Sequence, residues 1–215
     1  MCGAGCRVFS LLGRAGREAG ISSYSNLLAT LVGVCAVGLA IRLMDDFLDA
    51  ALDLRQGLQT PAHRFGSASL PYALAGLSVG SLLAPRLAAT LFLGAYAVGM
   101  ASDPTRALPS GLRGYQESLL AMLIGTLGAG PMLMTWAMTM MIAIQALDDL
   151  VDLRIDKHTG GRNWCHLYGT GEVMLCGLLC VAIGASLSLM LTLLTLIVAT
   201  VIDRIFHRRS GTVIV

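Results

Sequence analysis

Five long stretches of this sequence contain no charged residue, and this pattern limits the possible folds more than any other feature. They cover residues 19–41, 65–85, 87–102, 118–147 and 173–202. A helix that crosses a membrane needs about 20 largely apolar residues, within a range of about 17 to 25. Charged residues make up 13% of the chain, against about 25% in ordinary soluble proteins. The sequence therefore predicts an all-α, multi-pass transmembrane helical bundle.

Two of these stretches are too long for one ordinary span. Residues 118–147 contain Gly-Ala-Gly-Pro at 128–131, a strong turn signal, so we expect two helices there. Residues 173–202 have only Gly-Ala-Ser at 184–186 near the middle, and their division is less clear. About seven spans result. The expected organisation is an N-terminal interfacial stub at 1–21, one transmembrane domain at 22–209 and a C-terminal tail at 210–215.

The distribution of basic residues predicts the orientation of such a bundle. With seven spans, eleven of the fifteen basic residues fall on one side, which the positive-inside rule makes cytoplasmic. They are Arg42, Arg55, Arg64, Arg106, Arg113, Arg154, Lys157, Arg162, Arg204, Arg208 and Arg209. Arg7, Arg14 and Arg17 in the stub do not follow this rule. Because the net charge is only +2 and the basic residues are scattered among loops, we expect no binding of nucleic acid.

An aspartate-rich segment occurs twice, each time where an uncharged stretch ends. Residues 45–53 read DDFLDAALD and residues 148–156 read DDLVDLRID, with aspartate at the same four offsets. These segments hold eight of the thirteen acidic residues: Asp45, Asp46, Asp49, Asp53, Asp148, Asp149, Asp152 and Asp156. On a helix, the last three aspartates of each segment share one face and repel one another. The repeat therefore implies bound cations.

The ligand chemistry of these segments points to a hard divalent cation. Carboxylate oxygens are typical ligands of Mg²⁺, which usually combines one or two of them with substrate phosphates and water. Two facing clusters can hold Mg²⁺ around a diphosphate, and the apolar helices beside them suit an isoprenoid chain. Two simpler interpretations are a pair of solvated helix ends and a calcium site without chemistry. Two matching copies on one side of a protein with few other acids argue against both.

The two segments resemble the aspartate motifs of the UbiA superfamily of intramembrane prenyltransferases. The first motif and the following RQGLQTPAHRFGSASL match the family pattern, and DDLVDLRIDKHTGGRNWCHLYG matches it more closely. The resemblance implies metal binding by the eight aspartates, with catalytic roles for Asp46, Asp49, Asp149 and Asp152. It also implies that Arg55, Arg64, Lys157 and Arg162 contact the diphosphate. The implied reaction is Mg²⁺-dependent transfer of a prenyl group to a lipophilic or aromatic acceptor.

Two departures from the family pattern keep alternatives open. Asp45 replaces the usual asparagine, which creates the DDxxD pattern also found in terpene cyclases. A terpene cyclase that acts on a prenyl diphosphate without an acceptor is therefore one alternative. The first and last of the nine helices usual in the family have no counterpart, and a homo-oligomer is one way to complete the cavity wall. This departure suggests a second alternative, a catalytically silent membrane protein that binds isoprenoid lipid or metal.

A few polar residues outside the motifs are further candidates. Arg42 and Gln145 each precede one aspartate segment by one helical turn, where they could bind polar groups of the substrate. Arg42 could instead pair with a nearby aspartate. Glu117 could act as a base toward the acceptor or simply lie at the membrane interface. His63 and His158 lie close to the motifs, and a structural role is expected for both.

Overall fold

Helices make up almost all of the chain that the structure, a computed structural model, describes, namely residues 27–55, 61–153 and 163–210. No strand occurs in those three ranges, so the prediction of an all-α fold is confirmed. The helices are α2 (Leu27–Arg55), α3 (Pro61–Phe65), α4 (Ser69–Leu83), α5 (Pro85–Ser102), α6 (Gly114–Ala129), α7 (Pro131–Val151), α9 (Trp164–Tyr168) and α10 (Thr170–Ser210), with a 3-10 turn, η2 (Gly66–Ala68).

The predicted break at 128–131 separates α6 from α7. Gly130 has a φ of 97°, a conformation that glycine adopts far more readily than other residues. Pro131 follows as the first residue of α7, where its missing N–H leaves no helical hydrogen bond unmade. Local backbone chemistry alone therefore ends one helix and starts the next, and this part of the prediction is confirmed.

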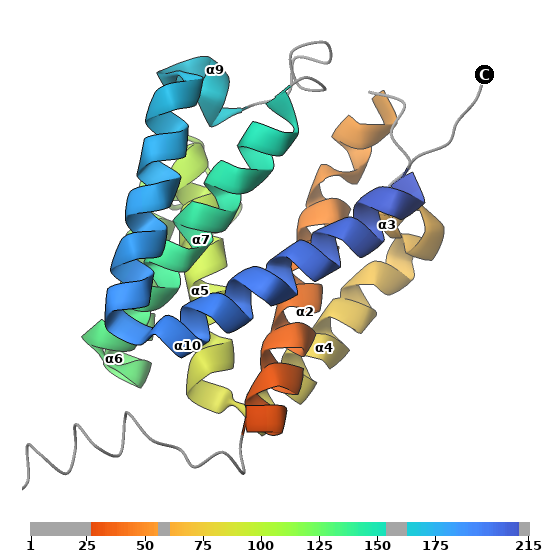
Figure 1. Ribbon diagram of the computed structural model, residues 1–215. Helices are drawn as coiled ribbons and strands as arrows, with labels where there is room; N and C mark the ends of the chain where they lie inside the picture. Colours follow the sequence, from red (N-terminus) through yellow and green to blue (C-terminus); the bar gives the residue numbers. More distant parts are fainter. Residues whose placement is uncertain (1–26, 56–60, 154–162, 211–215) are drawn as a thin grey trace, which may run out of the picture.

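The last uncharged stretch is also divided, slightly later than the sequence suggests. Within α10, Ser188 has non-helical angles, with φ −160° and ψ 96°, two residues beyond the predicted segment 184–186. The two halves of α10 therefore run in different directions. The first half lies along α7, and the second crosses to α2 (Figure 1). A hydrogen bond of 3.0 Å from Trp136 Nε1 to Thr192 Oγ1 joins α7 to the second half.

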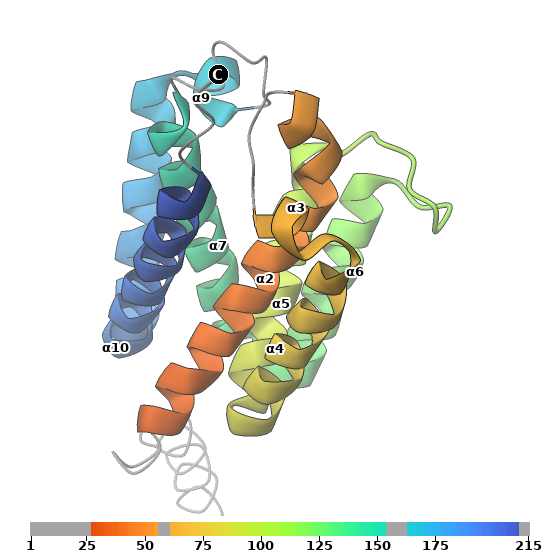
Figure 2. The same cartoon turned by 90° about the vertical axis from the view of Figure 1, so that its right-hand side faces the viewer.

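Helix α2 packs closely between two neighbouring helices. Figure 2 shows α4 on one side of α2 and the second half of α10 on the other. A Cβ atom at Gly80 of α4 would lie 2.3 Å from Val37 Cγ2 of α2, so any larger residue would force Val37 or one of the helices to move. Small residues at such contacts are typical of membrane helix pairs. The buried core between α2, α5 and α7 includes Val34, Leu91, Trp136 and Met140.

Many large apolar side chains face outward from the helices. Leu28, Leu82 and Leu127 are 71%, 83% and 78% exposed. Within the described residues, two helical segments are long and apolar enough to cross a membrane, Leu27–Ala50 and Thr170–Phe206. By contrast, α4 and α6 have 15 and 16 residues, just below the usual length of a span of about 17 to 25. The count of seven spans stays a prediction.

The close contact between α5 and α6 at Gly114 leads to a prediction about the stability of the protein. A Cβ atom at Gly114, the first residue of α6, would lie 2.4 Å from the Asp103 carbonyl oxygen and 2.6 Å from that of Met100. Because backbone atoms cannot move aside cheaply, Gly114→Ala should destabilise the protein by about 1–3 kcal/mol. Gly128→Ala in the same helix is the control, since nothing lies within 4 Å of its Cβ position. Reversible denaturation in detergent would measure both, and equal stability of the two variants would contradict the prediction.

Candidate functional site

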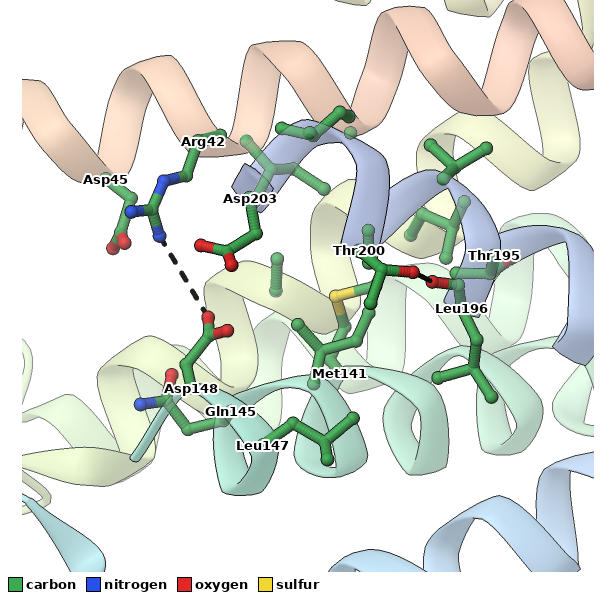
Figure 3. Close-up of a pocket in the computed structure, with 18 of the residues that line it drawn as sticks. Arg42, Asp45, Met141, Gln145, Leu147, Asp148, Thr195, Leu196, Thr200 and Asp203 are labelled. Carbon is green, nitrogen blue, oxygen red and sulfur yellow. Dashed lines mark hydrogen bonds and ion pairs between the residues drawn. The ribbon is translucent and has the colours of Figure 1, made fainter. Parts of the chain in front are cut away.

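A pocket of about 470 Å³ lies between α2, α5, α7 and the second half of α10 (Figure 3). This volume falls in the usual range for small-molecule sites of about 300–1,000 Å³. Most of its wall is apolar. The apolar lining includes Val34, Ile41, Leu91, Val98, Met141, Ile144, Leu196 and Val198. The lining of the pocket therefore suits a largely hydrocarbon ligand.

One end of the pocket is strongly polar, and three helices contribute to it. Arg42 and Asp45 come from α2, Gln145 and Asp148 come from α7, and Asp203 comes from α10 (Figure 3). The C-terminal ends of α2 and α7 lie at the same end of the bundle (Figure 1). The two aspartate segments, far apart in the sequence, therefore each place a carboxylate in one pocket.

The two segments orient their aspartates in the same way. The first aspartate of each segment, Asp45 or Asp148, lines the pocket. The second, Asp46 or Asp149, is buried with 5% of its surface exposed. Successive helix residues point about 100° apart, so neighbouring aspartates cannot share one environment. The internal repeat in the sequence is thus also a repeat in side-chain placement.

Arg42 connects the two aspartate segments electrostatically. Its Nε lies 3.3 Å from Asp46 Oδ1 on the same helix, and its Nη1 lies 4.0 Å from Asp148 Oδ2 on α7. Pairing with a nearby aspartate, one of the two roles considered for Arg42, is thus present in the structure, and a role in substrate binding stays a prediction. The negative charges of Asp45 and Asp203 also favour the charged form of Arg42. The guanidinium of Arg42 therefore lies between a carboxylate of the first segment and a carboxylate of the second.

Asp148 has an altered proton affinity at the polar end of the pocket. It lies just beyond Leu147, the last residue of the uncharged stretch. Removal of the carboxylate from water raises the pKa of Asp148 to about 7, partly opposed by Arg42, and the carboxylates of Asp203, Asp152 and Asp45 add to the rise. A cation bound beside Asp148 would lower this pKa, because it stabilises the charged form.

Asp149, predicted to be catalytic, holds a structural position instead of lining the pocket. Its Oδ1 accepts a hydrogen bond of 2.9 Å from Gln145 Nε2, and its Oδ2 accepts one of 2.8 Å from the Trp164 N–H. Its backbone carbonyl accepts a bond of 2.7 Å from Asn163 Nδ2, and Asn163 Oδ1 in turn caps α9 at Cys165 N. One carboxylate oxygen and the backbone carbonyl of Asp149 thus fasten the start of α9 to α7, and the other carboxylate oxygen accepts a hydrogen bond within α7.

The other predicted site residues are either outside the pocket wall or outside the described part of the chain. Asp49 is exposed on α2, Arg64 is exposed on α3, and Asp152 is half-buried at the end of α7. These three and Asp46 are not among the residues that line the pocket. Asp156, Lys157, His158 and Arg162, and the side chains of Asp53 and Arg55, lie outside the described residues.

The polar residues outside the pocket have local partners. His63 Nε2 donates a hydrogen bond of 2.9 Å to the Ala50 carbonyl, which gives His63 the expected structural role. Glu117 accepts hydrogen bonds from the hydroxyls of Ser110 and Tyr96. These bonds, with that from Ser110 the stronger influence, lower the pKa of Glu117 and make it a weaker base. Glu117 is also absent from the pocket wall.

Two carboxylates at the polar end have the donor chemistry that an Mg²⁺ ion shared with a phosphate group would need. In the described ranges, no three histidine, cysteine, aspartate or glutamate residues gather closely enough to form a metal site by themselves. Mg²⁺ does not require such a group, because it usually takes one or two carboxylates together with phosphate oxygens and water. Asp45 and Asp148, both facing the pocket, supply that all-oxygen donor set.

Asp203 was not predicted as a site residue. It belongs to neither aspartate segment, yet it lines the polar end of the pocket. The sequence did carry a signal, because Asp203 is the first charged residue after the uncharged stretch 173–202. Asp148 is likewise the first charged residue after 118–147, and Asp45 is the first acidic residue after 19–41. The predicted seven spans place all three residues on the same side of the membrane. Only the fold shows that all three line one pocket.

The chain was also compared with known proteins. No protein-family model, curated protein or solved structure matches it. The function is therefore inferred from the chemistry of the pocket and from the aspartate motifs.

Proposed function

We propose that this protein is an Mg²⁺-dependent intramembrane prenyltransferase of the UbiA type. It ionises an isoprenyl diphosphate and transfers the prenyl group to a lipophilic or aromatic acceptor. The observation that carries this proposal is the pocket itself, which joins an apolar body to a polar end built from both aspartate segments and Arg42. An isoprenyl diphosphate has the same division into an apolar tail and a highly charged head.

The substrate fits the pocket in one orientation. The diphosphate lies at the polar end, where Asp45 and Asp148 would hold Mg²⁺ and Arg42 would donate hydrogen bonds to phosphate oxygens. The tail lies in the apolar body, along side chains such as Leu91, Val98 and Met141. The reverse orientation would place the diphosphate against hydrocarbon, which costs far more than any contact there returns.

The reaction begins with cleavage of the bond between the prenyl carbon and the diphosphate oxygen, whose electrons leave with the diphosphate. Bound Mg²⁺ supplies charge stabilisation to this leaving group. Arg42 adds a second positive group at the same end, and the apolar wall excludes water from the allylic cation. The acceptor then forms a bond to the cation and loses a proton.

Several observations support a membrane location for this site. Two described helical segments are long and apolar enough to span a bilayer, and large apolar side chains are exposed along the bundle. Patches of that kind usually mark contact with lipid or another protein. The full proposal is a seven-span protein with the polar end of its pocket toward the cytoplasm. The excess of basic residues expected on that side supports this orientation.

The test is pyrophosphate release by purified, lipid-reconstituted protein given geranyl, farnesyl or geranylgeranyl diphosphate and a panel of aromatic and lipid acceptors. We expect release that requires both Mg²⁺ and an acceptor. Asp148→Asn should lower the rate by about 100-fold, because it removes one charge that positions the metal–diphosphate complex. Asp103→Asn, a carboxylate outside the pocket wall, should leave the rate unchanged.

Two results would contradict this proposal. A cyclic hydrocarbon or terpene alcohol formed without acceptor would identify a terpene cyclase. Binding of the diphosphate without pyrophosphate release in any combination would instead favour a silent isoprenoid-binding protein.

A further inference from the structure

A glycine in the wall of the pocket is not required by the packing around it. Gly99 lies inside α5, is exposed and lines the pocket. Glycine is less favourable than alanine inside a helix, because it loses more conformational freedom on folding. A Cβ atom at Gly99 would meet no atom of the described residues within 4 Å. The backbone of Gly99 also lacks the positive φ that favours glycine at other positions of the chain.

Other helical glycines differ from Gly99 in this respect. At Gly80 a Cβ atom would lie 2.3 Å from Val37 Cγ2. At Gly38, also in the pocket wall, it would lie 2.9 Å from Ile202 Cδ1. Both glycines allow two helices to approach closely. Gly99 instead faces open space in the wall of the pocket, so its missing side chain widens the pocket and serves no helix contact.

The position of Gly99 along α5 places it close to the polar end of the pocket. Gly94, five residues earlier, packs against α7, and its Cβ position would lie 3.4 Å from both the Ala137 carbonyl oxygen and Met141 Cγ. Because α6 returns between them, α5 and α7 run in the same direction (Figure 1). Five helical residues advance about 7.5 Å. Gly99 therefore reaches a level about one turn before Asp148 on α7.

We propose that Gly99 makes the room in which the first isoprene unit of the donor lies, next to the diphosphate. This inference rests on the proposed function in so far as the ligand is a prenyl diphosphate with its head at the polar end. With the diphosphate held beside Asp148, the first carbons of the prenyl group lie at the level of Gly99. Methyl branches make an isoprenoid chain wider than an unbranched one, and the absent side chain provides that width. Gly99 thus determines which groups the pocket accepts at the reacting carbon.

The experiment measures binding without turnover. The probes are geranyl, farnesyl and geranylgeranyl thiolodiphosphates, in which a sulfur atom replaces the oxygen between the prenyl group and the diphosphate and so slows ionisation. Each is titrated by calorimetry into the purified full-length chain in detergent with Mg²⁺ present. Gly99→Leu should weaken binding of each probe by at least about tenfold, since even one added methylene can cost that much in a fitted pocket. The loss should be equal for all three probes, because they share the first isoprene unit.

Two controls separate a steric effect in the pocket from damage to the protein. Inorganic pyrophosphate has no prenyl group, so Gly99→Leu should bind it as the unmodified chain does. Gly128→Leu places the same side chain at another helical glycine that has no described neighbour within 4 Å of its Cβ position, outside the pocket wall. This variant should bind every probe normally. Gly99→Ala adds a single carbon and should weaken binding less than Gly99→Leu.

The outcomes separate this inference from the proposed function. Unchanged affinity of Gly99→Leu for the three probes would overturn the inference. A loss confined to the longest probe would overturn it too, because Gly99 would then lie beside the far end of the tail. An equal loss of pyrophosphate binding, or no binding of any probe by the unmodified chain, would have the same consequence. If Gly99→Leu weakens all three probes in a protein that releases no pyrophosphate from prenyl diphosphates, the inference stands and the proposed reaction is wrong.

Discussion

Replacement of Arg42 by methionine is expected to lower the free energy of unfolding by about 2–3 kcal/mol. Removing one partner of a buried ion pair usually costs about 3–5 kcal/mol, and we expect less here because the Arg42 side chain is 28% exposed. Asp46, which is only 5% exposed, would lose the guanidinium that lies 3.3 Å from it. Asp148 would lose the same positive charge at 4.0 Å.

Mg²⁺ should restore part of the stability that Arg42→Met loses. In the proposed site the metal binds between Asp45 and Asp148, and Asp148 is one of the two partners of Arg42. The metal can therefore replace the positive charge beside Asp148 and stabilise the folded state by mass action. At the same time the affinity for inorganic pyrophosphate should fall, because Arg42 no longer donates to phosphate oxygens. Reversible denaturation in detergent, with Mg²⁺ or with a chelator, measures the first effect, and calorimetric titration measures the second.

Arg204→Met is the matched control for the loss of one positive charge at this end of the protein. Arg204 is exposed beside Asp203 and is not part of the pocket wall. A surface change of this kind usually alters stability by less than about 0.5 kcal/mol. If Mg²⁺ stabilised Arg42→Met no more than it stabilises Arg204→Met, the metal would not bind at the position proposed.

Asp149→Ala is expected to destabilise the protein by about 2–4 kcal/mol, with or without Mg²⁺. The change leaves two donors, Gln145 Nε2 and the Trp164 N–H, without the carboxylate that now accepts from both. Hydrogen bonds to a charged group contribute about 1.5–3 kcal/mol, and a buried donor left without a partner adds a penalty. The loss should be largest where α9 joins α7, so hydrogen exchange in α9 should rise before global unfolding.

Asp148→Ala gives the opposite pattern and is the control for this prediction. Asp148 lies in the pocket wall with 39% of its side chain exposed. Desolvation, and to a smaller extent the neighbouring carboxylates, raise its pKa against the opposing effect of Arg42. Its removal should cost little stability without metal and should reduce the stabilisation that Mg²⁺ provides. If Asp149→Ala kept its stability without metal but was no longer stabilised by Mg²⁺, Asp149 would be a metal ligand, as the resemblance of the aspartate motifs implies.

The different positions of Asp148 and Asp149 show how far the sequence could predict the site. The spacing of the aspartates correctly indicated two equivalent segments at one end of the bundle. It could not indicate which aspartate of each segment enters the pocket. A helix turns by about 100° per residue, so the outcome depends on which side of α2 faces α4 and which faces α10. The expected face began at Asp46 and Asp149, whereas the pocket contains Asp45 and Asp148.

The sequence by itself determined the helical class of this protein, the break between α6 and α7 and the pairing of the aspartate segments. These features depend on local chemistry: uncharged stretches, the φ of 97° at Gly130, and charges repeated at fixed spacing. Only the tertiary structure decided that Arg42 joins the two segments, that Asp149 anchors α9 and that Asp203 reaches the pocket. Each of these depends on how helices distant in sequence are rotated and crossed, and in particular on the bend at Ser188 that turns α10 toward α2. That rotation is set by packing between helices, which no single stretch of sequence specifies.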